Sequence, residues 1–252
     1  MRLGFIGTGT ITAHMVRGLK ASGLADWPIV VSPRGALVAA ELAQLPGVTV
    51  AGSNQAVVDA CDLVILSVRP QVAEAVIAPL MFRADMPILS LIAGLHIARI
   101  AEWTGARDIA RAIPLPFVER HQGVTPVFPP QPAAMQIFAA LGTALPVDNV
   151  LAFDGYGAAS ALMASYFGLL DCAQNWMVAQ GHPAADAGAY LRGLFGSLGD
   201  VARENPAGFD QLREDHSTKG GLNEMVFHRF VQGGGGEAMQ AALTAAFRRV
   251  QG

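Results

Sequence analysis

The segment RLGFIGTGTITAHMVRGLKASG, residues 2–23, contains in succession a short apolar run, a glycine-containing turn and an amphipathic stretch. The apolar run at residues 2–6 has the length of a short buried strand. After the turn, Ile11, Met15 and Leu19 recur at helical spacing, and Gly23 closes the pattern. The segment therefore predicts a strand that passes through a tight turn directly into a helix.

Short apolar runs alternate with helical patterns through the first 150 residues of the chain. Continuous apolar strands separated by helices are typical of a parallel sheet that is covered on both faces. Residues 1–150 are therefore predicted to form an α/β domain with a doubly wound sheet. The later runs are PIVVS at 28–32, GVTVAG at 47–52, DLVILSV at 62–68 and PILSLIAG at 87–94.

The turn GTG at residues 7–9 has the spacing of a dinucleotide-binding fingerprint. The first glycine allows a sharp turn, and the second lets the backbone approach a pyrophosphate that lies on the helix N-terminus. The third position of the fingerprint holds Thr12 in place of the usual Gly or Ala. The position of this turn between a predicted strand and a predicted helix nevertheless indicates a Rossmann dinucleotide site. The residues assigned to it here are Gly7, Gly9, Thr10 and Ile11.

The end of the second strand, VVSPRG, bears on which dinucleotide binds. An NAD site places Asp or Glu there, on the ribose 2′-hydroxyl. This chain has Ser32 and Arg34 in that region, and the next carboxylate is Glu41. Arginine can pair with a 2′-phosphate through two charge-assisted hydrogen bonds. The alternative is a solvated loop arginine, but the missing carboxylate favours NADP.

Two further strand ends fall at the carboxyl edge of the predicted sheet, where ligands of such folds bind. LSVRPQ follows one buried strand, and LIAGLH ends the next. These segments are predicted to wall the nicotinamide half of the cofactor, although either could be a simple strand-end turn. The residues concerned are Ser67, Val68, Arg69, Pro70, Ala93 and Gly94.

From residue 151 onward the chain reads as helix. It has no Lys or Arg between His121 and Tyr190, and residues 153–180 carry only Asp154 and Asp171 as charges. A helix that is apolar all round must be buried on all sides. About 100 residues can hardly bury it alone, so we expect residues 151–252 to be an all-helical dimerisation domain in a homodimer or higher homo-oligomer. The alternative is the central helix of a monomer.

The segment DHSTKGGLNEM, residues 215–225, brings hydroxyls, a lysine and two glycines to the start of a predicted helix. Free backbone N–H groups and the positive end of the helix dipole favour an anion. Ser217 and Thr218 add hydroxyl donors, and Lys219 is one of two lysines in the chain. The segment therefore predicts an anion-binding turn, or alternatively an ordinary helix cap with Lys219 in solvent.

Composition excludes several classes of function. The chain has 252 residues and a net charge of −3, so it lacks the excess of positive charge that is typical of nucleic-acid-binding proteins. No apolar stretch approaches the roughly 18 residues of a membrane helix, and the N-terminus does not read as a signal peptide. Cys61 and Cys172 lack a C-x-x-C partner, so a reduced, cytoplasmic chain is expected. No metal-binding cluster of His and Cys is evident, and no metal is expected.

These motifs together resemble the pyrroline-5-carboxylate reductase family. GFIGTGTITAHMVRGLKASG is similar to the family's GFIGxGxMxxAxxxGL, and CDLVILSVRPQVAEAVI to its segment around ILAVKPQ. LSLIAGLHIARIAEWTG is similar to ISxxAGxxIxxLxxxLG, GHPAADA to GLPxxxA, and HSTKGGLNEM to VTSPGGTTxxGL. The resemblance implies a Rossmann domain followed by a helical dimerisation domain, in which helices of two subunits interlace. It also implies that Asn54 lies near the adenosine ribose and its phosphate.

The resemblance implies NADPH-dependent reduction of 1-pyrroline-5-carboxylate to proline, an oxidoreductase reaction on CH–NH donors. The glycine turn would then receive the carboxylate of this cyclic imine. Hydride transfer to a protonated C=N needs placement more than acid–base groups, so a missing catalytic His or Glu does not count against it. The residues assigned to the substrate site are Thr218, Gly221, Leu222 and Asn223.

The segments that resemble the family least are those near the substrate. RAIPLPF stands where the family has RxMPNTP, and ASALMASY where it has SGSGPAY. Two alternatives therefore stay open: a related NADP-dependent reductase with a different imine or carbonyl substrate, and a cofactor-binding protein without catalysis. Chemistry that uses a helix lysine is disfavoured, because residues 21–218 contain no lysine.

Overall fold

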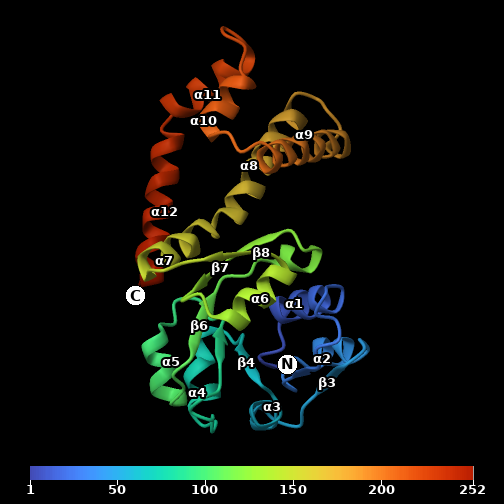
Figure 1. The fold of residues 1–252 in the computed structure, drawn as a ribbon. Coiled ribbons are helices and arrows are strands. Elements are labelled where there is room, and N and C mark those ends of the chain that lie inside the picture. Colours follow the sequence, from blue (N-terminus) through green and yellow to red (C-terminus); the bar gives the residue numbers. More distant parts are fainter. Residues whose placement is uncertain (252) are drawn as a thin grey trace. The chain divides into compact units, whose positions relative to one another are not determined.

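The structure is a computed structural model that describes residues 1–251 (Figure 1). The chain forms two compact units. The first comprises Met1–Gly157 together with the last turn of the chain's final helix, from Phe247 onward, and the second comprises Ala158–Ala246. The expected boundary at residue 150 coincides with the start of helix α7 (Val150–Ala159), most of which packs with the first unit.

The first unit contains a sheet of eight strands in the order β3-β2-β1-β4-β5-β6-β7-β8 (Figure 1). Neighbouring strands are parallel, except that β6 and β7 are antiparallel. The predicted α/β class is confirmed, and the antiparallel β7 adds a reversal that the sequence did not indicate. The strands are β1 (Leu3–Ile6), β2 (Ile29–Val31), β3 (Val48–Val50), β4 (Leu63–Leu66), β5 (Ile88–Ser90), β6 (Ile109–Ala112), β7 (Gly123–Phe128) and β8 (Gly142–Pro146).

Helices cover both faces of this sheet, because successive side chains of each buried strand point to opposite sides. In β1, Phe5 belongs to one hydrophobic core and Ile6 to the other. The first core is completed by α1, α2 and α6, and the second by α3, α4 and α5. The helical elements are α1 (Thr10–Lys20), α2 (Ala36–Leu42), α3 (Asn54–Ala60), the 3-10 turn η1 (Pro70–Val72), α4 (Ala73–Ile77), α5 (Ile97–Thr104), the 3-10 turn η2 (Pro116–Arg120) and α6 (Pro132–Ala140).

Helix α7 is fixed to the sheet by a buried ion pair. Arg111 Nη1 of β6 lies 3.5 Å from Asp154 Oδ1 of α7, and both side chains are almost completely buried. The Arg111 guanidinium also stacks 4.6 Å from the ring centre of Phe153. Burial lowers the pKa of Arg111, while the nearby Asp154 carboxylate acts in the opposite direction. Asp154 Oδ1 and Arg111 Nε have no hydrogen-bond partner among the described residues, so the contact between Nη1 and Oδ1 is ionic.

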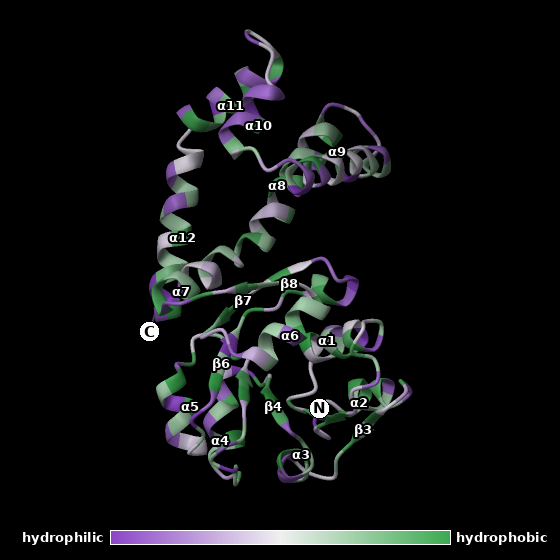
Figure 2. Ribbon diagram, viewed as in Figure 1, coloured by the Kyte–Doolittle hydropathy of each residue, from purple (hydrophilic) through white to green (hydrophobic). Residues whose placement is uncertain are grey.

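The second unit is helical, in agreement with the predicted class. Its α8 and α9 pack against each other, with Pro183 as the N-cap of α9. Within the described part of the chain, no residue of α8 is buried, and Phe167 and Trp176 are 66% and 65% exposed. Hydrophilic residues gather on α10 (Figure 2), whereas α11 also carries exposed apolar side chains, such as Val226 at 61% and Phe230 at 50%. The helices are α8 (Leu162–Ala179), α9 (Ala184–Glu204), α10 (Phe209–Asp215), α11 (Leu222–Gln232) and α12 (Gly235–Gln251).

Among residues 1–251, no helix is long and apolar enough to cross a membrane. The same residues contain no group of three or more His, Cys, Asp or Glu side chains arranged to hold a metal ion.

Candidate cofactor site

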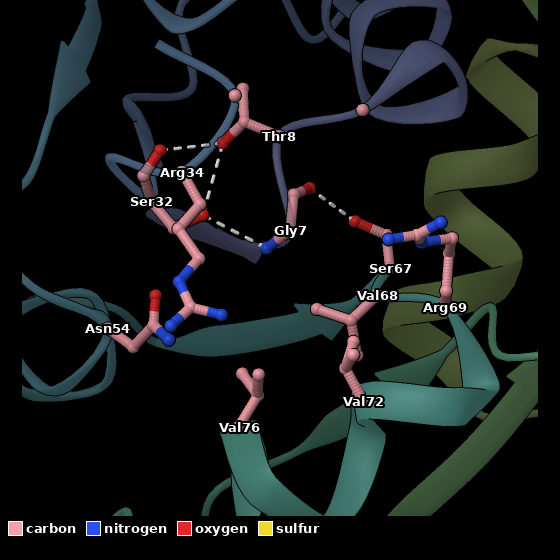
Figure 3. Close-up of a pocket in the computed structure, with 12 residues that line it drawn as sticks. Gly7, Thr8, Ser32, Arg34, Asn54, Ser67, Val68, Arg69, Val72 and Val76 are labelled. Atoms are coloured by element: carbon pink, nitrogen blue, oxygen red, sulfur yellow. Dashed lines mark hydrogen bonds between the residues drawn. The ribbon is translucent and has the colours of Figure 1, made fainter.

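A cleft of about 360 Å³ opens at the carboxyl ends of β1, β2 and β4 (Figure 3). Strand β1 lies between β2 and β4, so the chain first extends the sheet to one side of β1 and then crosses to the other. Such a reversal of strand order leaves a crevice in which open α/β sheets bind ligands. The lining residues are Gly7, Thr8, Gly9, Ser32, Arg34, Gly35, Asn54, Ser67, Val68, Arg69, Val72 and Val76.

The two glycines of the predicted fingerprint have different roles in the cleft. Gly7 has φ +103°, and a Cβ there would lie 2.7 Å from the backbone carbonyl of Ser67. Gly9 is the N-cap of α1, and a Cβ there would meet no described atom within 4 Å. Gly7 is therefore needed for the turn itself, whereas Gly9 keeps open space in front of the helix. Thr10 and Ile11 lie in the first turn of α1, where backbone N–H groups have no partner one turn earlier.

Ser32 and Arg34 lie in the cleft wall but face different partners. The Ser32 side chain is fully buried, and its Oγ accepts a hydrogen bond from Gly7 N at 3.0 Å. The exposed Arg34 side chain instead extends into the cleft toward Asn54 (Figure 3). Gly35 has φ +77°, and a Cβ there would lie 2.2 Å from Thr8 O, so the arginine loop packs directly on the glycine turn.

The nicotinamide-side residues predicted from the strand ends are only partly brought together. Ser67, Val68 and Arg69 line the cleft, and Pro70 begins η1 directly after them. Ala93 and Gly94 lie beyond β5 and are exposed, but they are not part of the lining of this cleft.

Sequence reasoning missed Thr8, Gly35, Val72 and Val76 of the cleft lining, and the contacts that Thr12 makes beneath it. Val72 of η1 and Val76 of α4 form an apolar wall of the cleft. The available signal in the sequence was two valines four residues apart, shortly after the end of β4. Thr12, which departs from the fingerprint, is completely buried, and its Oγ1 donates to Gly7 O at 2.6 Å. The same hydroxyl lies 2.7 Å from Ser67 Oγ.

The predicted substrate residues meet at one turn in the second unit. Gly221 is the N-cap of α11, and its N–H donates to Thr218 O at 2.8 Å. Asn223 Nδ2 donates to His216 O at 2.6 Å, so this amide holds the turn. Leu222 begins α11 and is 76% exposed.

No side chain caps α11, and Glu224 in its first turn instead bonds the backbone just before the N-cap residue Gly221. Its Oε2 accepts a hydrogen bond from Gly220 N at 2.6 Å, and Gly220 has φ +74°. A second cavity, of about 540 Å³, adjoins the turn. It is lined by Arg213, Glu214, Ser217, Lys219, Glu224, Phe227 and His228.

Comparison with known proteins identifies the fold and the family. The family model described as "NADP oxidoreductase coenzyme F420-dependent" matches residues 2–94. The chain is 32% identical over 180 residues to the pyrroline-5-carboxylate reductase of Pseudomonas aeruginosa, an alignment that covers 67% of this chain and 66% of that protein. It is 25% identical over 270 aligned positions to the enzyme of the same name from Pisum sativum, covering 98% and 94% of the two chains.

Solved structures match over nearly the whole length. The pyrroline-5-carboxylate reductase of Coxiella burnetii has a TM-score of 0.86 at 24% identity, covering 99% of this chain and 97% of that one. The Plasmodium falciparum pyrroline carboxylate reductase, solved with NADP bound, has a TM-score of 0.83 at 15% identity and covers 100% and 97%. The sheet, the helical unit that follows it and the sequence relatives all agree, and the chain belongs to the pyrroline-5-carboxylate reductase family.

Proposed function

We propose that this protein is an NADPH-dependent oxidoreductase acting on CH–NH donors, which reduces 1-pyrroline-5-carboxylate to proline. The observation that carries the proposal is the cleft at the strand-order reversal, with Gly7 and Gly9 at its base and Arg34 in its wall. Curated relatives over most of the chain carry the name of that activity.

The residues present fit a phosphorylated dinucleotide. Gly9 and the first turn of α1, with Thr10 and Ile11, would hold the pyrophosphate, because the open helix N-terminus favours an anion. Arg34, with Asn54 opposite, would hold the 2′-phosphate. The nicotinamide, which supplies the hydride when NADPH is bound, would lie toward the β4 and β5 ends, which carry Ser67–Pro70 and Ala93–Gly94.

The turn at Thr218, Gly221, Leu222 and Asn223 would position the substrate carboxylate. The reaction asks the protein mainly to place an electrophilic carbon at about 3 to 3.5 Å from the hydride donor. Lys219, on the adjoining cavity, adds positive charge for an anionic substrate. His228 also lines this cavity and is a residue type that can act as a general base. Reduction of a protonated imine requires no general base, so His228 is given no catalytic role.

A second candidate is reduction of a different cyclic imine. It is favoured by the turn itself, where Glu224 already occupies Gly220 N and Asn223 already bonds His216 O. The Gly220 N–H and the Asn223 amide already have partners within the turn. A substrate whose anionic group is smaller, or lies farther from the reacting carbon, would compete less for these two donors.

We also propose that the protein is a homodimer formed through the helical unit. Exposed apolar side chains such as Phe167, Trp176 and Tyr190 would be covered by a second copy of the same helices. Light scattering at micromolar concentration tests this, and a monodisperse monomer would exclude it. The free thiols of Cys61 and Cys172 fit the reducing cytoplasm as the place of action, which cell fractionation would check.

The activity is tested by NADPH oxidation at 340 nm with 1-pyrroline-5-carboxylate. NADH and a piperideine carboxylate serve as the cofactor and substrate controls. The proposal expects turnover with NADPH in the usual range of roughly 1 to 10³ s⁻¹. Turnover of the piperideine alone would favour the second candidate, and NADPH binding without turnover of either would contradict both.

A further inference from the structure

The peptide of Gly7 is held from both sides by side-chain hydroxyls. On one side, Ser32 Oγ accepts from Gly7 N at 3.0 Å, and Thr8 Oγ1 donates to Ser32 O at 2.6 Å. On the other side, Gly7 O accepts from Thr12 Oγ1 and from Ser67 Oγ, each at 2.6 Å (Figure 3 shows the Ser67 bond). The glycine turn is thus tied to the ends of β2 and β4, the two strands that flank β1.

Thr12 and Ser67 are both departures from the motifs to which their segments belong. Thr12 stands where the fingerprint has Gly or Ala, and Ser67 lies in LSVRPQ, which resembles the family's LAVKPQ. The two residues are 55 positions apart, yet their hydroxyl oxygens are 2.7 Å apart. The larger side chain at position 12 is accommodated because its hydroxyl has two partners at hydrogen-bond distance in a fully buried place.

The Ser67 hydroxyl has two lone pairs, of which the Thr12 proton can take one, so Ser67 Oγ is able to accept one more donor. Thr12 and Ser67 have one hydroxyl proton each, but there are three short contacts among their two oxygens and Gly7 O. The Ser67 proton goes to Gly7 O, and the Thr12 proton is shared between Gly7 O and Ser67 Oγ, so at least one lone pair of Ser67 Oγ has no donor. Ser67 is half-buried and lines the cleft, whereas Thr12 is closed off from solvent. The open acceptor is accordingly Ser67 Oγ.

We propose that Thr12 is a positioning residue for the dinucleotide, acting through Ser67 and the Gly7 carbonyl. It fixes the Ser67 hydroxyl so that Oγ accepts a hydrogen bond from a donor of the dinucleotide, a ribose hydroxyl or the carboxamide N–H. It also holds the phosphate-binding turn in its bound form before the ligand arrives, which lowers the entropy cost of binding. This inference rests on the proposed function only in taking a dinucleotide as the ligand.

The test is a double-mutant cycle on NADPH affinity, measured by fluorescence titration of the full-length protein. Thr12→Val keeps the shape and removes the hydroxyl, and Ser67→Ala removes the other hydroxyl. Each is expected to raise the Kd for NADPH about five- to tenfold, the range of a hydrogen bond in a closed site. The double variant is expected to match the weaker single variant, because the two side chains act as one unit.

Two controls separate positioning from general loss of structure. Thr12→Ser retains the hydroxyl and is expected to bind NADPH with nearly wild-type Kd. Thr104→Val removes another buried hydroxyl, which donates to Ile100 O at 2.7 Å in α5, and is expected to leave the Kd unchanged. The ratio of NADPH to NADH affinity should stay constant in the Thr12 and Ser67 variants, since Arg34 is intact.

Multiplicative effects of Thr12→Val and Ser67→Ala would overturn the proposal, as would failure of Thr12→Ser to restore binding. A wild-type protein that binds neither NADPH nor NADH would overturn it together with the proposed function. A wild-type protein that binds NADPH with the expected coupling, but does not reduce 1-pyrroline-5-carboxylate, would support this inference and contradict the proposed substrate.

Discussion

Arg34 is the residue on which cofactor choice is expected to depend. Its side chain extends into the cleft at the end of β2, and no carboxylate lines the cleft within the described residues. Charge-assisted hydrogen bonds contribute about 1.5–3 kcal/mol, so Arg34→Asp should weaken NADPH relative to NADH by about tenfold or more. Titration with both cofactors measures the ratio. Exposed Arg107→Asp is the matched control, and an unchanged ratio in Arg34→Asp would disprove the assignment.

Gly221 tests the proposed substrate turn. A Cβ at this position would lie 2.8 Å from Thr218 O, so Gly221→Val should displace the start of α11. The expected result is a severalfold higher KM for the imine with an unchanged Kd for NADPH, because the cofactor cleft lies in the other unit. Gly23→Val, at an exposed position where a Cβ meets no described atom within 4 Å, is the control. An unchanged KM in Gly221→Val would remove the turn from the substrate site.

For individual residues, the sequence indicated which positions belong to the turn and the cleft better than it indicated which side chains contact one another. Gly7 and Arg34 were recognisable because a sharp turn requires glycine and a missing carboxylate is visible in the sequence. The contact between Thr12 and Ser67 was not, because it depends on β1 and β4 being neighbours in the sheet. The internal partners of Asn223 and Glu224 likewise depend on the exact path of the turn.

At the scale of elements, α1 and η2 are joined by an ionisable pair. His14 Nδ1 of α1 hydrogen-bonds Glu119 Oε2 of η2, and this bond lowers the pKa of Glu119 below its ordinary value of 4.5. A carboxyl pKa that is lower in the folded state adds stability above the ordinary pKa, and that stability is lost as the pH falls through the lowered value.

Glu119→Gln is therefore expected to lower the melting temperature at neutral pH, and the gap to wild type should close in acid below about pH 4. Thermal melts across this range measure it. The same change at exposed Glu204 should shift the melting temperature little at any pH. A gap that stays constant or widens in acid would show that the bond does not act through the Glu119 charge.

Removal of one partner of the ion pair between β6 and α7 should strongly destabilise the first unit. Asp154→Leu leaves Arg111 buried without its counter-charge, which is expected to reduce the free energy of unfolding by about 3–5 kcal/mol. The double change Arg111→Met and Asp154→Leu should recover much of this, because a well-packed apolar pair can replace a buried ion pair. Urea unfolding followed by circular dichroism measures both. An Asp154→Leu protein as stable as wild type would contradict the expected cost.

The strands were predictable from their apolar runs, but their directions and some helix ends were not. GVTPVF reads the same whether β7 runs parallel or antiparallel to β6, so the reversal appears only in the structure. The segment PQVAEAVIAPLM reads as one helix, yet it forms η1 followed by α4, which ends at Ile77. Its helical pattern continues, but Pro79 prevents regular helix beyond the residue before it.

At the scale of the whole molecule, the exposed apolar helices should determine assembly. Trp176 is 65% exposed on α8, and Trp176→Glu would place a charge in the proposed dimer interface. The expected outcome is a halved mass by light scattering at micromolar concentration. Met81→Glu, at a 77% exposed side chain of the first unit, should leave the mass unchanged. A Trp176→Glu protein with wild-type mass would move the interface away from this part of α8.

The high hydrophobicity of residues 153–180 was visible in the sequence, but the surfaces that pack against these residues were not. Their composition indicated burial, whereas the single chain leaves α8 open throughout. Composition alone does not show which surface covers an apolar helix, and in the described chain no residue of α8 is buried. The division of the chain also escaped prediction at its far end, because the last turn of α12 packs with the sheet unit.

That last turn has a consequence for biosynthesis. A Cβ at Gly157 would lie 3.5 Å from Val250 Cγ1, and His96 Nε2 lies 3.4 Å from Gln251 O, so the final residues close part of the sheet unit's surface. Domains generally fold in the order in which the ribosome produces them. Here the N-terminal unit emerges early but waits for its final contacts until all of Ala158–Ala246 has been translated. A nascent chain stalled before Phe247 would lack the contact of Val250 with Gly157 of α7 and that of Gln251 with His96.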